Sequence, residues 1–382
     1  MTTNELFTLS AKKIDNSIYD DACKKWDSIS KPLDGLGDFE KVTSKILALN
    51  GNAEITQYKK ILVVMCADHG IVEEGVSQCG QEVTFQVAKL LGEGRSTASK
   101  MASFAGADCM AVDVGINSDV VLPDVKNEKV KRGTNNFLVT PAMTIDDVLD
   151  AIDVGIRIAR ECKENGYHIL AAGEMGIGNT TSGTALLCAL TGVELEQVLG
   201  RGAGLSDEGL ERKRSVILQA LDLHGLKNVQ CEEAKISDSG GNVGFIDKKL
   251  AGLTDKAKYT LNAMSKVGGL ELAAMTGLFI GGAVYGIPVM IDGVLCAVSA
   301  LCASRIMPES VGYMIPSHAG REKGTSYVLD LLGLKPFING DMALGEGTGA
   351  LMTMPLLDMA IDFYVKATTF EQGQIEQYVR QN

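Results

Sequence analysis

Residues 59–70, KKILVVMCADHG, form an apolar, β-rich run that ends in Asp68 and His69. Four more runs of this kind follow, at 108–116, 168–176, 288–293 and 313–318. Helical patterns separate them, at 82–91, 96–106, 144–166, 200–221 and 343–361, and precede them at 14–52 around a loop at 31–40. Strands alternating with helices predict an α/β fold, a Rossmann-like, three-layer arrangement with a parallel sheet between helices.

Each run delivers a polar residue where it ends: Asp68, Asp113, Glu174, Asp292 and the pair Ser317–His318. In open α/β sheets the ligand crevice lies outside the carboxyl ends of the strands. The pattern therefore predicts one composite site at that edge. The least regular stretch, 226–255, is interpreted as a surface loop or hairpin inserted between two helices.

The uncharged stretch 272–291 is long enough to cross a bilayer. It contains four glycines before Pro288 and Asp292. We interpret it as a small-residue helix followed by a short buried strand, PVMID, because glycines also allow close helix packing in water-soluble cores. A membrane span is the alternative.

The 382 residues carry a formal net charge of −12, with 46% hydrophobic and 22% charged residues. This composition is typical of a globular enzyme and argues against nucleic acid or an anionic membrane as partner. The nine cysteines are odd in number and form no C-x-x-C pair, so neither a disulfide framework nor a zinc site is predicted. The N-terminal segment lacks the apolar core of a signal peptide, and we expect a cytoplasmic protein.

The sharpest local motif is GEMGIGNTTSGTALLCALTG, residues 173–192. A strand enters, three glycines turn the chain, and residues 179–181 can cap the helix that follows. Such a turn points backbone N–H groups at an anion, although it matches neither a P-loop nor a G-x-G-x-x-G fingerprint. A tight connection with a good cap explains the glycines equally well. Glu174 favours function, because a carboxylate beside a phosphate cradle costs electrostatic energy.

A second glycine-rich turn, at 200–204, precedes a helix that carries Lys213. Taken alone, Lys213 is a solvated surface charge. Beside a phosphate loop it becomes the natural counter-ion.

The segment 343–361, ALGEGTGALMTMPLLDMAI, places Glu346 in the first turn of an almost wholly apolar helix. Partial desolvation raises the pKa of a glutamate toward neutrality, which suits a general base. The helix dipole opposes that shift, and a structural role at the helix start is the alternative.

Asp68–His69 and Ser317–His318 invite comparison with a nucleophile triad, but the chain has no G-x-S-x-G elbow. We interpret His69 and His318 as loop anchors at strand ends rather than as metal ligands.

Several segments together resemble the nicotinate-nucleotide–dimethylbenzimidazole phosphoribosyltransferase family of cobalamin biosynthesis. They span about residues 31–365 in family order: KPLDGLGDFE, CADHGIVEEGVS, GEMGIGNTT, GRGAGL, SKVGGLELAAMTG, PVMIDG, IPSHAGREKG and LGEGTGAL. The resemblance implies transfer of the 5-phosphoribosyl group from nicotinate mononucleotide to 5,6-dimethylbenzimidazole. The products would be α-ribazole 5′-phosphate and nicotinate.

The resemblance also implies a homodimer acting on small molecules. It implies a large α/β domain at about 60–345 and a smaller helical domain built from 1–60 and about 345–382. By motif position, Glu346 matches the catalytic base and Glu174 a second carboxylate that relays the proton or steadies the ribose. The phosphate-side matches are Gly176, Gly178, Asn179, Thr180, Gly202 and Lys213. No metal or cofactor is expected, because nicotinate is bonded through a positively charged pyridinium nitrogen and departs without a metal or a general acid.

Departures from the family pattern concern the pocket for the attacking base. Some members have a serine near Cys79 and a proline in place of Gly80, whereas Gln86 and Leu344 remain candidate wall residues. The resemblance therefore leaves open a purine or a phenol as the accepted base. A non-catalytic nucleotide-binding subunit of the same fold is a further alternative.

Overall fold

A computed structural model describes residues 1–52, 58–227, 250 and 252–380. Its main sheet has six strands in the order β3-β2-β1-β4-β5-β6, and every neighbouring pair is parallel. The strands are β1 (Lys60–Ala67), β2 (Ala107–Gly115), β3 (Lys126–Asn127), β4 (Ile169–Met175), β5 (Val289–Ile291) and β6 (Met314–Pro316). The predicted α/β fold with a parallel sheet is confirmed.

The central strand β1 is buried along its whole length. Its side chains alternate between two cores: Ile61, Val63 and Met65 pack on one face, and Leu62 and Val64 on the other. A strand covered on both faces needs apolar residues at every position, which explains the uninterrupted run in the sequence.

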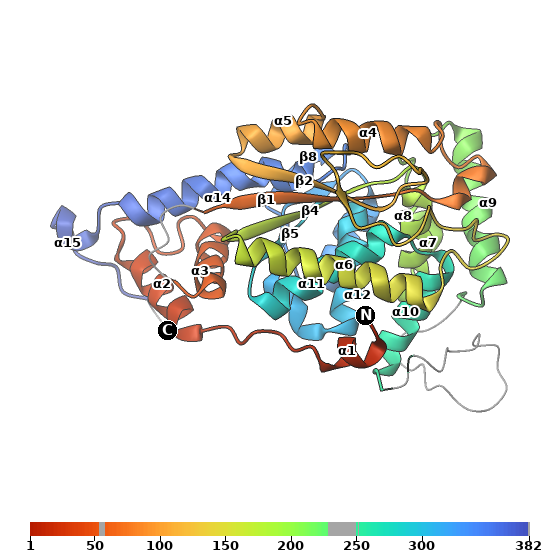
Figure 1. Cartoon of the computed structure of the whole chain (residues 1–382). Coiled ribbons are helices and arrows are strands. Elements are labelled where there is room, and N and C mark those ends of the chain that lie inside the picture. The colour runs from red at the N-terminus through yellow and green to blue at the C-terminus, as the bar shows by residue number, and fades with distance from the viewer. Residues whose placement is uncertain (53–57, 228–249, 251, 381–382) are drawn as a thin grey trace.

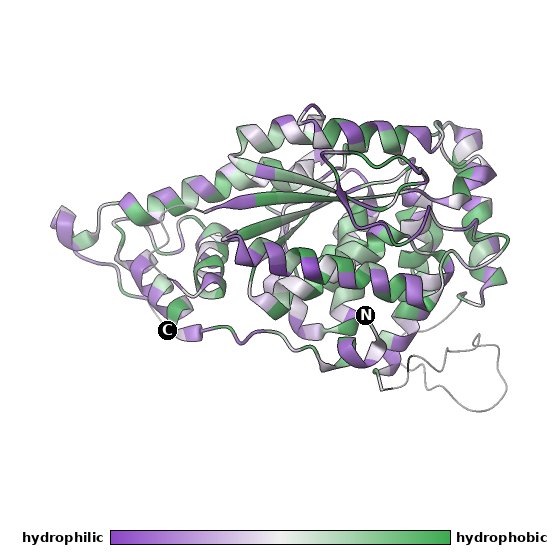
Figure 2. Ribbon diagram, viewed as in Figure 1, coloured by the Kyte–Doolittle hydropathy of each residue, from purple (hydrophilic) through white to green (hydrophobic). Residues whose placement is uncertain are grey.

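Helices cover both faces of this sheet (Figure 1). Along one face lie α6 (Ile145–Glu164), α7 (Asn179–Thr191), α10 (Asp255–Val267), α11 (Leu270–Tyr285) and α12 (Val294–Ile306). Along the other lie α4 (Glu82–Gly92), α5 (Thr97–Phe104) and α14 (Thr348–Lys366). Figure 2 shows the strands as largely hydrophobic, whereas the outer helices alternate hydrophobic and hydrophilic residues.

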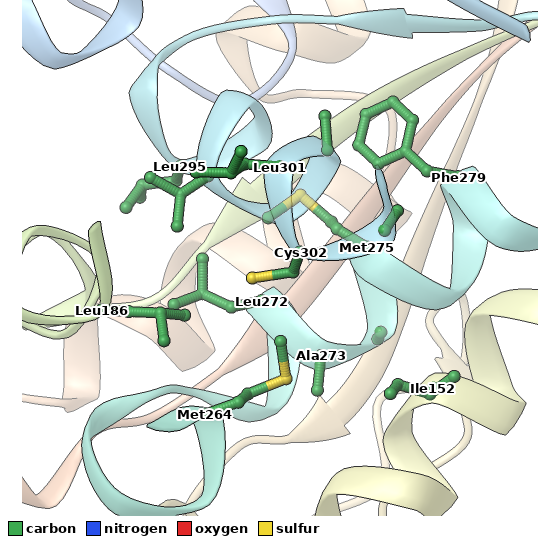
Figure 3. Close-up of a cluster of buried hydrophobic side chains, with 14 of the residues drawn as sticks. Ile152, Leu186, Met264, Leu272, Ala273, Met275, Phe279, Leu295, Leu301 and Cys302 are labelled. Atoms are coloured by element: carbon green, nitrogen blue, oxygen red, sulfur yellow. The ribbon is translucent and has the colours of Figure 1, made fainter. Parts of the chain in front are cut away.

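The stretch 272–291 forms α11 and β5, as the helix-and-strand interpretation predicted. Its apolar side chains, among them Leu272, Met275 and Phe279, belong to the buried cluster in Figure 3. Gly277 faces α6 so closely that an added Cβ would overlap the carbonyl of Ile152. Among the residues that the structure describes, no helix is long and apolar enough to span a membrane.

Both chain ends contribute helices beside the sheet (Figure 1). They are α2 (Asn16–Ser28), α3 (Asp38–Asn50) and α15 (Phe370–Gly373). Trp26 of α2 stacks on Phe363 of α14 and packs at a tilt against Tyr364. The first helix, α1 (Thr3–Thr8), places Leu6 in the core on the α6 side instead. The division into two domains stays a prediction. Most of the interpreted insertion at 226–255 lies outside the described residues.

The run 313–318 contributes to two sheets rather than one. β6 ends at Pro316, and β7 (His318–Gly320) pairs with β8 (Ile338–Met342) in a separate two-stranded sheet. The remaining elements are α8 (Leu195–Val198), α9 (Asp207–Leu223), α13 (Lys323–Leu331) and the 3₁₀ helices η1 (Gly70–Glu74) and η3 (Pro308–Tyr313).

Candidate active site

A cavity of about 230 Å³ opens at the carboxyl edge of the sheet. It is lined by residues within 174–180, 202–203, 292–296, 318–325 and 342–346. These segments follow β4, β5 and β6 or precede α9 and α14, so the predicted composite site at this edge is where the structure has its cavity.

The turn between β4 and α7 forms one wall. Gly178, with φ of +94°, is the residue before the helix, and no side chain caps α7 there. Asn179 donates instead to Glu174 Oε2. The prediction that residues 179–181 cap α7 is therefore wrong, because a left-handed glycine begins the helix and the amide serves the carboxylate. The start of α7, a preferred place for an anion, is left facing the cavity.

Lys213 of α9 is fully buried rather than solvated. Its Nζ donates to Thr180 Oγ1 at 3.1 Å and to the Gly200 carbonyl at 2.9 Å. Burial lowers the pKa of Lys213 to about 8. The ammonium sits behind Thr180, which lines the cavity, whereas Lys213 and Gly178 do not line it directly. Gly202 packs against the Thr180 hydroxyl: a Cβ added to Gly202 would lie 2.7 Å from Thr180 Oγ1.

Glu174 ends β4 inside the cavity. Burial, followed by the charges of Glu271 and Asp292, raises the pKa of Glu174 to about 8. The Asn179 amide acts in the opposite direction. These surroundings favour the protonated form of Glu174.

Glu346 lies before α14 rather than in its first turn, because the helix begins at Thr348 after Gly347. Its φ is +57°, an uncommon value for a residue with a side chain, and both flanking glycines have φ of +83°. Its Oε2 is buried and has no hydrogen-bond partner in the described part of the chain. Burial is the main cause that raises the pKa of Glu346, and Asp292 adds to it.

Sequence reasoning noted Asp292 as a strand end but gave it no role. Its Oδ2 accepts from Gly347 N at 3.0 Å, and its Oδ1 accepts from Gly349 N at 2.7 Å and Ala350 N at 3.2 Å. Asp292 therefore fixes the turn that carries Glu346. The signal available in the sequence was an aspartate at the end of a strand, and only the topology shows which turn it binds.

Glu271 was likewise missed, since it lies in a run that reads as a plain apolar helix. His69 Nε2 lies 2.7 Å from Glu271 Oε1, and His69 Nδ1 lies 2.8 Å from Ser182 Oγ. His69 therefore anchors two helices. Ser317 Oγ donates to the Ile291 carbonyl and lies 3.0 Å from His318 Nδ1. Ser317 and Ser182 are both fully buried, so neither histidine has an accessible serine nucleophile beside it. Among the described residues, no cluster of three or more His, Cys, Asp or Glu could hold a metal.

The residues predicted for the base pocket are not brought together. Leu344 lines the cavity and is 51% exposed. Cys79 lies in the connection before α4, with Sγ 3.9 Å from Ser77 Oγ, and Gln86 is exposed on α4. Neither lines the cavity. Their contact with the attacking base stays a prediction.

The fold and the cavity, with a helix start suited to an anion and two carboxylates in its lining, fit a transferase of phosphorylated sugars. A family model described as "Phosphoribosyltransferase" matches residues 11–375. Two similar curated proteins are the nicotinate-nucleotide–dimethylbenzimidazole phosphoribosyltransferases of Acetivibrio thermocellus (37% identical, 93% of each chain covered) and Ruminiclostridium cellulolyticum (35% identical, 97% of each). The crystal structure of CobT from Thermus thermophilus matches with a TM-score of 0.81 at 33% identity, covering 95% of this chain and all of that one.

The chain belongs to this phosphoribosyltransferase family, that of nicotinate-nucleotide–dimethylbenzimidazole phosphoribosyltransferases, and is an enzyme of the transferase class. The resemblance of its motifs to the family is confirmed over nearly the whole chain.

Proposed function

We propose that the enzyme transfers the 5-phosphoribosyl group of nicotinate mononucleotide to 5,6-dimethylbenzimidazole, giving α-ribazole 5′-phosphate and nicotinate. The observation that carries this proposal is Glu346, whose carboxylate has one buried, unpartnered oxygen, among the described residues, beside a helix start suited to phosphate. The backbone of Ala98 is a hydrogen-bond partner of this carboxylate, and the oxygen that has no partner is the one available to take a proton from a substrate. The names of the similar proteins support the choice of substrates.

The phosphate of the nucleotide binds at the turn of Gly176 and Gly178, where the start of α7 supplies partial positive charge. Asn179 and Thr180 complete this wall, and Gly202 brings the second glycine-rich turn against it. Lys213 contributes its charge through Thr180, to which it is hydrogen-bonded. A phosphate there would hold the Lys213 ammonium in its charged form despite burial.

In the reaction, an azole nitrogen of the base attacks C1′ while the bond from C1′ to the pyridinium nitrogen breaks. The bonding pair returns to the ring, which leaves as neutral pyridine carrying its carboxylate. The proton on the other azole nitrogen passes to Glu346. The nucleotide has the β configuration and the product the α configuration, so one inversion without a covalent intermediate accounts for both. The pyridinium's own charge drives departure, and no metal is needed.

The carboxylates also favour this chemistry electrostatically. Asp292 and Glu346 face the position of a ribose that gains positive character as the bond breaks. A site that only bound nucleotide would gain nothing from such groups, which argues against the non-catalytic alternative.

The test is incubation of the purified enzyme with nicotinate mononucleotide and, in turn, dimethylbenzimidazole, benzimidazole, adenine and p-cresol. Mass spectrometry identifies the riboside, and nicotinate release should equal riboside formed. Product with dimethylbenzimidazole supports the proposal. Product with adenine or p-cresol alone supports the same chemistry on another base. No product with any base, from a folded protein that binds the nucleotide, overturns it.

We further propose that two copies form a homodimer through α14. Met352, Leu356, Met359 and Phe363 recur at helical spacing on one face and are 37–70% exposed. Phe104, which is 89% exposed, lies in a separate hollow with Asp358 and Ile361, on another side of α14. An exposed apolar stripe of this kind is typical of a subunit interface. We also propose a cytoplasmic location, which the free thiols of the eight described cysteines support.

A further inference from the structure

One corner of the cavity holds two polar side chains that take no part in the proton transfer to Glu346. His318 begins β7 and is 4% exposed, and Thr325 lies in the first turn of α13 and is 1% exposed. Both line the cavity. Thr325 Oγ1 is buried and has no hydrogen-bond partner in the described part of the chain. A buried hydroxyl without a partner is costly, so its presence in the lining of a substrate cavity points to a ligand.

The two side chains meet in front of Gly320, which also lines the cavity. A Cβ added to Gly320 would lie 3.3 Å from Thr325 Oγ1 and 3.7 Å from His318 Nε2. The carbonyl oxygen of Met342 would lie 3.4 Å from the same point. Because Gly320 has no side chain, the hydroxyl and the imidazole nitrogen border one common space.

The hydrogen bonds of His318 leave its Nε2 for a ligand. Ser317 Oγ gives its single hydrogen to the Ile291 carbonyl, so it accepts from His318 Nδ1 over 3.0 Å. Asp292 Oδ1, 3.9 Å from the same Nδ1, is too distant for a hydrogen bond. Nε2 has no hydrogen-bond partner among the described residues. It accepts a hydrogen bond when the ring is neutral and donates one when the ring is protonated.

This corner lies between the two ends of the nucleotide site. On the phosphate side, the Glu322 carboxylate packs against Gly200, whose carbonyl accepts from Lys213. On the side of the catalytic base, a Cβ added to Gly349 in the first turn of α14 would overlap the His318 ring. In a nucleotide the ribose joins the phosphate to the reacting carbon. The ribose is therefore the part of the substrate that spans this stretch of the wall.

We propose that Thr325 and His318 bind a hydroxyl group of the ribose of nicotinate mononucleotide and make the enzyme selective for ribonucleotides. The inference rests on the proposed function and deepens it. A hydroxyl both donates and accepts, so it pairs with Thr325 Oγ1 and with His318 Nε2 in either protonation state of the ring. The carboxylate of nicotinate suits this corner less well, because it only accepts and the Asp292 carboxylate lies beside the same imidazole.

The first test compares nicotinate mononucleotide with its 2′-deoxy and 3′-deoxy analogues at saturating dimethylbenzimidazole. Thr325→Val keeps the shape of the side chain and removes its hydroxyl. It should lower kcat/KM for the ribonucleotide about 3–10-fold, the usual worth of one neutral hydrogen bond. For one of the two deoxy analogues it should leave kcat/KM unchanged, because that analogue lacks the partner hydroxyl. Comparing variants on the same nucleotide removes the intrinsic difference in reactivity between the nucleotides.

Two further variants serve as controls. Thr325→Ser keeps a hydroxyl and should retain most of the wild-type kcat/KM for the ribonucleotide. Ser310→Ala removes another buried hydroxyl that has no partner among the described residues, but Ser310 lies before β6 and does not line the cavity. It should leave kcat/KM for all three nucleotides unchanged.

The second test needs no turnover. Calorimetric titration of the wild-type enzyme should show one deoxy analogue binding at least about threefold more weakly than the ribonucleotide, and Thr325→Val should remove that difference. Wild-type enzyme that binds all three nucleotides equally, or does not bind them, would overturn the proposal.

A loss in folded Thr325→Val that is equal for all three nucleotides would also overturn it. So would a loss that vanishes only with nicotinamide mononucleotide, since this would assign the corner to the ring carboxylate. If the nucleotides bind in the expected order but no base is turned over, the transfer reaction fails and the assignment of the ribose corner stands.

Discussion

Glu346 lines the cavity from a left-handed backbone position between two glycines, in a turn that Asp292 holds through the Gly347 amide. We predict that Glu346→Gln keeps the fold and the binding of nicotinate mononucleotide but lowers kcat by about 10²–10⁴-fold, the usual range for loss of a general base. Steady-state kinetics at saturating base measure the loss, and calorimetric titration of the nucleotide measures binding. A variant that keeps a tenth of wild-type kcat would show that Glu346 is not the base.

Lys213 differs from an ordinary lysine in being buried and hydrogen-bonded to a cavity residue. We predict that Lys213→Ala raises KM for nicotinate mononucleotide more than KM for the base, by about 1.5–3 kcal/mol in binding free energy, because Thr180 loses the charge-assisted hydrogen bond that holds its hydroxyl at the cavity wall. Lys163→Ala is the control. Lys163 is also partly buried and donates to a backbone carbonyl, that of Gly286, but lies away from the cavity. Equal increases in KM for the nucleotide and for the base would show that Lys213 does not contribute to phosphate binding.

The protonation of Glu174 also predicts how stability depends on pH. The pKa of Glu174 is about 8 in the folded protein against an ordinary value of 4.5, so between these values the folded protein holds a proton that the unfolded chain has lost. This contribution to stability is complete below about pH 4.5 and is lost as the pH rises through 8. We expect the free energy of unfolding to fall less steeply between about pH 5 and pH 8 in Glu174→Gln than in wild type. Urea titrations across that range test it, and parallel curves would contradict it.

At the scale of elements, the close contact of α11 with α6 explains the small residues that made the sequence ambiguous. Gly277 meets the backbone of Ile152, and Gly155 of α6 meets the backbone of Ala274 in return. We predict that Gly277→Ala forces the two helices apart and costs about 1–3 kcal/mol of stability, as overpacking does. Gly312→Ala should cost less, because its Cβ would find only Ile14 at 3.5 Å. Chemical unfolding measures the stability of both variants. A larger loss for Gly277→Ala than for Gly312→Ala would support close packing of the two helices, and equal losses would contradict it.

The elements that the sequence predicts correctly are those that a local hydrophobic pattern is enough to identify. β1 and β4 are long and mostly buried, and β2 is buried over its second half, so the hydrophobic runs in the sequence predict all three. β3 has two residues and β8 is polar and largely exposed, so each forms only because a neighbouring strand offers hydrogen-bond partners. Such pairing is tertiary and leaves no local pattern.

The same distinction holds within the site. Glu174, Glu346 and Thr180 could be placed because glycine-rich turns put them at the ends of elements. The burial of Lys213, the three hydrogen bonds of Asp292 and the contact of Glu271 with His69 each join segments far apart in the chain. The assumed cap on α7 failed for a related reason, since Asn179 has a competing partner in Glu174 that the helix pattern alone does not reveal.

At the scale of the whole molecule, the three layers direct the cavity-lining segments to one edge and leave much of the outer face of α14 exposed, although Phe363 at its end stacks on Trp26. The helix that begins at the Glu346 turn is the one that carries the exposed stripe of Met352, Leu356, Met359 and Phe363. Association through this face would brace the helix at whose start the base is held. A dimer would thus protect the site as well as cover apolar surface.

We therefore predict that the enzyme sediments as a dimer at micromolar concentration and that Met359→Asp shifts it toward monomer. Met359 is 70% exposed in the single chain, so an aspartate there costs little in the monomer but loses its hydration when a second copy covers the face. Val139→Asp is the control, because Val139 is 77% exposed and lies outside α14. Sedimentation velocity of the three proteins separates the outcomes. A monomeric wild-type protein would contradict the proposed dimer. A Met359→Asp protein that is as dimeric as the control would show that the subunits meet at another surface. If the dimer braces α14, dissociation should also lower kcat while leaving KM for the nucleotide nearly unchanged, because the cradle at the start of α7 does not depend on that helix.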